Sequence, residues 1–130
     1  MNINLSETYS PELEAAIHET EPFDFPAGDL LHPWEAGELH FLTARDAVGK
    51  LLGVLAYQIN KAPQGLSMEI VGVNAKRTPL ALRMMFQALC SSADEKAARL
   101  CCMIEKAAMA RIAERYGMKE RSRFFVRELS

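Results

Sequence analysis

The sequence has few of the residues from which metal centres and disulfide frameworks are built. It contains three cysteines, Cys90, Cys101 and Cys102, and three histidines, and none of them is spaced like the ligands of a zinc site. An odd number of cysteines without a Cys-x-x-Cys pair is typical of free thiols in a reducing compartment. We therefore predict no metal site and no disulfide framework.

Long apolar runs and runs of like charge are also missing. No stretch approaches the roughly 20 apolar residues that span a membrane, and the first residues lack a basic region followed by an apolar one. The 15 basic residues nearly balance the 17 acidic ones, and the bases that lean towards the C-terminus are expected to form a solvated face. Neither a membrane nor a nucleic acid is an expected partner, and we predict a soluble protein made in the cytoplasm.

What is present is the composition of an ordinary globular protein. The chain has 130 residues, of which 49% are hydrophobic and 25% are charged. That length predicts a single domain, residues 1–130, with a core large enough to need no disulfide or metal. The sequence shows no internal repeat and no low-complexity segment.

The first quarter of the chain predicts one helix followed by an irregular segment. Ser10 can cap a helix near residues 10–20, Pro11 suits its first turn, and an apolar stripe follows at Leu13, Ala16 and Ile17. Residues 21–34 contain prolines and a glycine and are expected to be an extended loop. Its aromatic residues have two open interpretations, as anchors packed on the core or as an interface for another protein. They are Phe23, Phe25 and Trp34.

The middle of the chain predicts three antiparallel strands, near residues 39–45, 51–59 and 66–73. Residues 46–50 supply the first turn, in which Gly49 can adopt a positive φ. In the third strand, alternation predicts that Met68, Ile70 and Gly72 share one face. The other face is expected to carry Glu69, Val71 and Val73.

The second half predicts a strand–helix–strand–helix–strand order. A helix near 79–96 follows Thr78, a potential cap, and Pro79 in its first turn. An apolar run near 98–104, a second helix near 105–116 and a final strand near 122–128 complete the pattern. The strand–helix–strand unit predicts that the runs near 66–73 and 98–104 pair in parallel.

This order of elements resembles the GNAT acetyltransferase superfamily. Residues 34–53, with "EAGEL", "TARD" and "GKLLG", look like the hairpin of small GNAT-like proteins encoded by phages and prophages, and residues 113–119 look like the family's "YEKLGF" signature. The resemblance implies an α/β fold, in which an antiparallel meander and a β-α-β-α-β unit form one mixed sheet flanked by helices.

The resemblance also implies a position for acetyl-CoA. In the family, a glycine-containing loop before a helix presents backbone N–H groups to the pyrophosphate. The matching positions are residues 76–81, where Lys76, Arg77, Thr78 and Ala81 would contact the cofactor if it binds. Pro79 replaces a glycine and has no N–H. A plain capped helix start is the alternative interpretation, and we expect acetyl-CoA to bind weakly or not at all.

Two residues are candidates for catalysis if the chain is an enzyme. Glu69 is the only acid in its predicted strand, and it could act as a general base or be an edge or solvent-facing residue. The family's tyrosine acid corresponds to Ala113. Tyr116 stands close by and is the remaining candidate, although its position just before Gly117 favours a packing role.

Two functional hypotheses therefore remain open. The first is a non-catalytic GNAT-fold protein, a phage-type structural or protein-interaction component that binds phage particle components or its own copies and needs no cofactor. The second is an active N-acetyltransferase that uses acetyl-CoA through a divergent loop. The first explains the missing glycine and tyrosine, whereas the second explains why Lys76 and Arg77 are retained.

Overall fold

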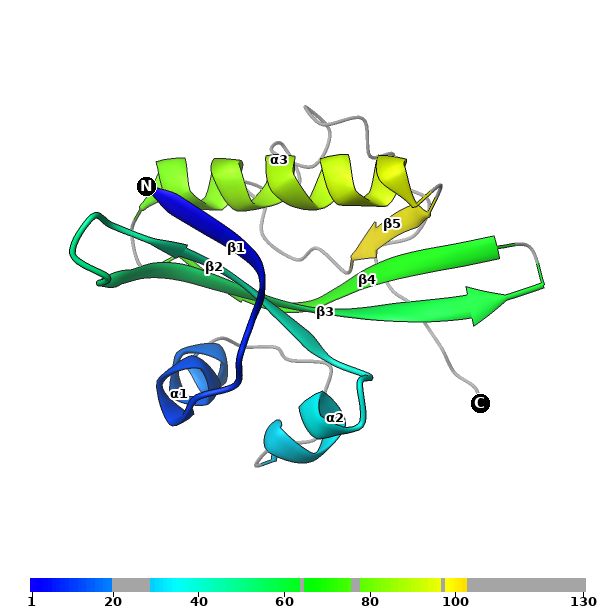
Figure 1. The fold of residues 1–130 in the computed structure, drawn as a ribbon, viewed down its shortest axis with the longest axis horizontal. Coiled ribbons are helices and arrows are strands. Elements are labelled where there is room, and N and C mark those ends of the chain that lie inside the picture. The colour runs from blue at the N-terminus through cyan, green and yellow to red at the C-terminus, as the bar shows by residue number, and fades with distance from the viewer. Residues whose placement is uncertain (20–28, 64, 76–77, 97, 103–130) are drawn as a thin grey trace.

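The structure is a computed structural model that describes residues 1–19, 29–63, 65–75, 78–96 and 98–102. Over these residues the chain forms one five-stranded sheet with helices on both of its faces (Figure 1). The predicted helix near 105–116 and the predicted strand near 122–128 lie outside the described residues.

The sheet has the strand order β1-β2-β3-β4-β5. The strands are β1 (Asn2–Glu7), β2 (His40–Arg45), β3 (Leu51–Ala62), β4 (Gly65–Asn74) and β5 (Arg99–Cys102). Neighbours are antiparallel from β1 to β4, and β5 is parallel to β4. The predicted meander and the predicted parallel pair are both confirmed, as is the turn between β2 and β3, where Gly49 has a φ of +89°.

Strand β1 is not among the strands predicted from the sequence. Its side chains are mostly exposed, so it lacks the apolar signal that marks a strand with one buried face. It is held as an edge strand by pairing with β2, from Asn2 opposite Arg45 to Glu7 opposite Phe41. The hydroxyl of Tyr57 in β3 also donates a hydrogen bond of 2.8 Å to the backbone carbonyl of Leu5.

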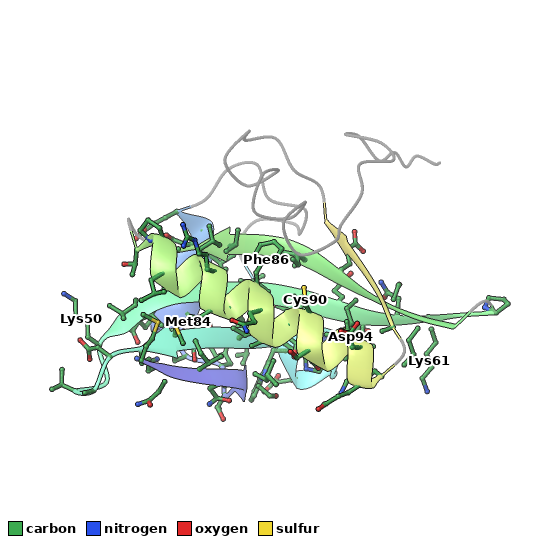
Figure 2. The ribbon with its side chains drawn as sticks, turned by 90° about the horizontal axis from the view of Figure 1, so that it is seen from above. Lys50, Lys61, Met84, Phe86, Cys90 and Asp94 are labelled. Carbon is green, nitrogen blue, oxygen red and sulfur yellow. The ribbon has the colours of Figure 1, made fainter. Side chains whose placement is uncertain are left out.

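The two longest described helices pack on opposite faces of the sheet. Helix α1 (Pro11–His18) begins as predicted, because the N–H of Leu13 donates to the Ser10 hydroxyl at 3.3 Å, and it buries its predicted apolar stripe. Helix α3 (Pro79–Glu95) also matches its predicted extent. Figure 2 looks down on α3 as it lies across the sheet, with Lys50 and Lys61 near opposite ends of the molecule.

A short helix, α2 (Leu31–Glu35), covers the end of the segment that the sequence predicts to be irregular, so that expectation is wrong for residues 31–34. Leu30 is the N-cap residue, and the carboxylate of the preceding Asp29 accepts hydrogen bonds from the N–H groups of Leu31, at 3.1 Å, and His32, at 3.3 Å, which satisfies two donors of the first turn. Pro33 falls in the first turn, where a missing N–H breaks no intrahelical bond.

The core has two parts, one on each face of the sheet. On the face of α3, apolar side chains of β2, β3 and β4 pack against Ala81, Met85, Phe86 and Leu89. On the face of α1, a second set of apolar residues, all but Leu39 in strands, packs against α1 and Leu30. These are Leu39, Phe41, Leu51, Val54, Ala56 and Val71. The sheet is therefore covered on both faces, by α3 on one and by the α1–α2 layer on the other.

A β-bulge in β4 changes which side chains share a face. The register passes from Ala56 opposite Gly72 to Tyr57 opposite Ile70, so Val71 is the extra residue. Val71 packs on the face of α1, but Val73 packs on the face of α3. The predicted shared face of these two valines is therefore wrong, because strict alternation ends at the bulge.

None of the helices in the described part of the chain is long and apolar enough to cross a membrane.

Candidate functional site: the end of β4 and the start of α3

The segment between β4 and α3 contains the positions that the sequence analysis associates with a cofactor. Strand β4 ends at Asn74, and the N–H of Thr78 donates a 2.8 Å hydrogen bond to the carbonyl of Ala75. This turn leads directly into α3, whose first residue is Pro79. Lys76 and Arg77 lie inside the turn but outside the described residues, so their predicted contacts remain predictions.

The start of α3 offers few backbone donors to a ligand. Thr78 is the N-cap residue, but its side chain makes no capping hydrogen bond, which corrects the predicted side-chain cap. Its own N–H is engaged with Ala75, and Pro79 has none. The amides of Leu80 and Ala81 are the next in line, and the first N–H groups of a helix have no intrahelical acceptor.

Ala81, a predicted cofactor contact, has its methyl group in the core. Its side chain is fully buried against Met85 and the sheet, whereas that of Leu80 is 56% exposed. The small side chain of Ala81 therefore fits the space beneath the first turn of α3. This packing leaves open whether its N–H meets a ligand, which stays a prediction.

Glu69 lies in the part of β4 that is paired on both sides. Its register partners are Gln58 in β3 and Cys101 in β5. Because Met68 and Ile70 are buried on the face of α3, the Glu69 side chain lies on the opposite face, where it is half-buried. Because β4 is paired on both sides, Glu69 is not an edge residue, and its half-buried carboxylate leaves the general-base and solvent-facing interpretations open. Tyr116, the other candidate, lies outside the described residues.

Gly53 in β3 allows the end of β4 and α3 to approach closely. A Cβ at this position would lie 2.8 Å from the terminal methyl of Met85, 3.3 Å from the Cα of Ala75 and 3.4 Å from the carbonyl oxygen of Asn74. The methionine side chain can move, but the backbone of the turn cannot do so without shifting the start of α3. Gly53 is therefore a spacing residue for this turn.

We expect Gly53→Ala to lower the free energy of unfolding by about 1–2 kcal/mol, because an added methyl group overpacks this junction. Chemical denaturation measures the change. Gly37→Ala is unsuitable as a control because Gly37 has a φ of +78°, so Ala47→Gly in the exposed β2–β3 turn serves instead. A Gly53→Ala protein as stable as the parent would show that the turn adjusts freely.

Asn74 joins the end of β4 to the C-terminus of α1. Its side-chain amide donates to the carbonyl of Ala16 at 2.8 Å and to the carboxylate of Glu19 at 3.0 Å. The Ala16 carbonyl belongs to the last turn of α1 and also accepts from the N–H of Glu19 at 3.3 Å, so the Asn74 amide is a second donor to it. The sequence analysis did not identify this contact, because its partners are separated by more than 50 residues.

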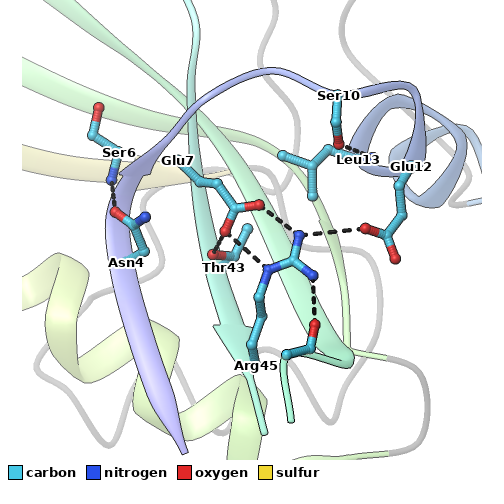
Figure 3. A network of polar contacts seen from close by, with 9 residues as sticks. Asn4, Ser6, Glu7, Ser10, Glu12, Leu13, Thr43 and Arg45 are labelled. Carbon is cyan, nitrogen blue, oxygen red and sulfur yellow. Dashed lines mark hydrogen bonds and ion pairs between the residues drawn. The ribbon is translucent and has the colours of Figure 1, made fainter. Parts of the chain in front are cut away.

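A polar network ties β1, β2 and α1 together on the face of α1 (Figure 3). The Glu7 carboxylate accepts from the Thr43 hydroxyl at 2.5 Å and from the Arg45 guanidinium at 2.5 and 3.1 Å. Arg45 also reaches the carboxylate of Glu12 at 3.3 Å and the carbonyl of Gly49 at 2.9 Å. Hydrogen bonds from Arg45 hold the pKa of Glu7 below its ordinary value, although burial opposes the shift.

Of the predicted interface residues, only Trp34 is described. It is half-buried in α2, with its ring centroid 6.0 Å from that of Tyr9, and it packs on the core on the face of α1. Tyr9 lies in turn 6.1 Å from the ring of Phe41. Trp34 thus makes the core contacts of one interpretation, and because the residue is only half-buried the other interpretation stays a prediction. Phe23 and Phe25 lie outside the described residues.

No metal site is found in the part of the chain that the structure describes, where no three His, Cys, Asp or Glu side chains gather to hold an ion. Cys90 is free and half-buried on α3, and burial raises the pKa of its thiol, with Asp94 adding to the shift.

This arrangement of strands and helices is the GNAT acetyltransferase fold. A probable acetyltransferase superposes with a TM-score of 0.73 at 14% identity, covering 100% of this chain and 97% of that chain. A predicted acetyltransferase from Clostridium acetobutylicum with acetyl-CoA has a TM-score of 0.70 at 14% identity, covering 98% and 95%. At these identities the likeness shows a shared fold.

A third similar structure is a ribosomal-protein-alanine N-acetyltransferase from Brucella melitensis biovar Abortus 2308. Its TM-score is 0.64 at 16% identity, and the alignment covers 99% of this chain and 100% of that chain. No family model matches the sequence, and no curated protein sequence matches it significantly. These three neighbours are named as acetyltransferases, and the predicted fold class is confirmed.

Proposed function

We propose that this chain uses an acetyltransferase fold to bind other proteins rather than to transfer an acetyl group. The observation that carries the proposal is the start of α3. The N–H of Thr78 donates to the carbonyl of Ala75, and Pro79 has no N–H. Two consecutive backbone donors are therefore lost where the fold's cofactor loop would present them. Thr78 and Pro79 therefore offer no backbone N–H to a pyrophosphate.

The sequence adds a second reason. The position that corresponds to the family's tyrosine acid is Ala113, which has no group to protonate a departing thiolate. The resemblance of residues 34–53 to phage-encoded GNAT-like proteins favours a structural or interaction role in a phage particle, after synthesis in the host cytoplasm. In this proposal the chain keeps the scaffold of the fold without its reaction.

The alternative is an active, acetyl-CoA-dependent N-acetyltransferase. It is supported by the fold that this chain shares with a structure containing acetyl-CoA, and by the half-buried carboxylate of Glu69 in β4. In that case Lys76 and Arg77 would replace the lost backbone donors with side-chain charge. Glu69 would accept a proton from the acceptor amine, and Glu69→Gln would abolish acetyl transfer.

Isothermal titration of the full chain with acetyl-CoA tests the proposal. We expect weak binding, with a dissociation constant in the millimolar range or no measurable heat. Pro79→Gly should strengthen binding by about tenfold or more, because it restores one donor to a charged phosphate. Pro63→Gly, in the exposed turn between β3 and β4, is the matched control and should change nothing.

Tight binding of acetyl-CoA would contradict the proposal. A low-micromolar dissociation constant in the unmodified chain, lost when Lys76 and Arg77 are both changed to alanine, would reject the proposal and support the enzyme. A Pro79→Gly chain that binds no better than the parent would show that the missing N–H is not what limits acetyl-CoA binding.

A further inference from the structure

Acidic residues are segregated in the first third of the chain. Residues 1–44 contain nine acidic residues and no lysine or arginine, so all 15 basic residues follow them. This part of the chain supplies α1 and α2, which lie on the face of the sheet opposite α3 (Figure 1). The first base, Arg45, is paired with Glu7 and Glu12. Of the described acids, Glu12, Glu14, Asp29 and Glu35 lie on or directly before α1 and α2, which themselves contain no lysine or arginine, so these helices carry an excess of negative charge.

Two half-buried aromatic side chains and one exposed leucine lie in the same layer. Helix α2 has no buried residue, and Leu31 is 38% exposed on it. The half-buried Trp34 ring lies against Tyr9, whose hydroxyl donates a short hydrogen bond to Glu14. That bond, with burial and the nearby charges of Glu14 and Asp29, raises the pKa of Tyr9 to about 12. Two carboxylates thus flank an aromatic pair.

We propose that the α1–α2 surface, formed by Tyr9, Glu14, Asp29, Leu31 and Trp34, binds an arginine- or lysine-rich segment of a partner protein. This inference rests on the proposed protein-binding function and names the chemistry of the partner. It also gives a role to Trp34, which the sequence analysis identifies as a possible interface residue.

The chemistry of the surface selects such a partner. A guanidinium or ammonium group is attracted to the face of a tryptophan or tyrosine ring within about 6 Å of its centre. The carboxylates beside the rings add ion pairs, for which no Lys or Arg of residues 1–44 competes, although the His18 ring already lies 3.2 Å from the Glu14 carboxylate. Leu31 offers an apolar contact to the aliphatic part of the bound side chain. A nucleic acid would be repelled by the same charge.

A short peptide of alternating arginine and serine, titrated into the full chain by calorimetry, tests the proposal. We expect saturable binding that weakens with added salt, and no binding of a peptide of alternating glutamate and serine. Combining Glu14→Gln with Asp29→Asn removes two charges but keeps groups that can accept from Tyr9 and from the first turn of α2. This double variant should bind the arginine peptide about tenfold more weakly.

A matched double variant on the other face of the sheet separates a defined site from diffuse attraction. Asp94→Asn with Glu95→Gln removes the same charge from α3 and should leave binding unchanged. Trp34→Leu should weaken binding severalfold with an unchanged circular dichroism spectrum, since it removes the aromatic face.

Three results would overturn the proposal. Binding that is absent, or that both double variants weaken equally, would leave no specific site on α1 and α2. Self-association in size-exclusion chromatography that only the Glu14 and Asp29 variant abolishes would assign the surface to a second copy of the chain. The acetyl-CoA titration is independent of these measurements. A failure of the proposed protein-binding function can therefore be distinguished from a failure of the arginine-binding surface.

Discussion

Replacing Phe86 with alanine is expected to lower the free energy of unfolding by roughly 3–5 kcal/mol, the largest single effect that we predict. Phe86 is fully buried and contributes to the core between α3 and the sheet. Truncating it removes a large apolar side chain and leaves a cavity, because β2, β3 and β4 hold the rest of that core in place. Denaturant unfolding followed by far-ultraviolet circular dichroism measures the loss.

The neighbouring residue supplies the control for this experiment. Gln87 follows Phe86 in α3 but is exposed, so Gln87→Ala should change the stability by no more than about 0.5 kcal/mol. If Phe86→Ala costs less than about 1 kcal/mol, the packing of α3 on the sheet is not the main source of stability of this domain.

The second large effect concerns the network of Figure 3. We expect Arg45→Met to lower the free energy of unfolding by about 2–3 kcal/mol at neutral pH, because it leaves the largely buried carboxylate of Glu7 without its charged partner. The Arg45 side chain is 24% exposed and the Glu7 side chain is 18% exposed, so this ion pair is more shielded from water than a surface salt bridge. Lys50→Met in the adjacent turn is the matched control.

The same pair predicts how stability depends on pH. The folded state lowers the pKa of Glu7, so the stabilisation is present at pH values above the ordinary carboxyl pKa of 4.5. It is lost as the pH falls through the lowered value, where Glu7 takes up a proton in the folded protein. The difference between the parent and Arg45→Met should therefore shrink in acid. A difference that stays constant down to acid pH would contradict the assignment.

Local patterns in the sequence were sufficient to predict the elements with a strong apolar period. The extent of α3 and the three strands of the meander follow from the spacing of their apolar residues and from the glycines and prolines between them. The parallel position of β5 follows from the helix that precedes it, since a crossover of that length returns the chain in the same direction.

The same patterns failed where an element depends on contacts from elsewhere. Strand β1 is polar and exposed, and it becomes a strand because β2 offers an edge to pair with. Helix α2 is too short to be stable alone, and it forms where Asp29 accepts from its first turn and Trp34 packs on Tyr9. The bulge at Val71 has no signal in β4 itself, because a register shift is a property of two strands.

The candidate sites divide in the same way. The sequence alone determined that Pro79 lacks an N–H and that residues 1–44 carry no lysine or arginine, because these are properties of residue identity. Only the tertiary structure decided that Thr78 donates to Ala75, that Asn74 joins α1 and that Arg45 pairs with Glu7. Each of those bonds depends on backbone geometry or on residues far apart in the chain, which a periodic pattern does not encode.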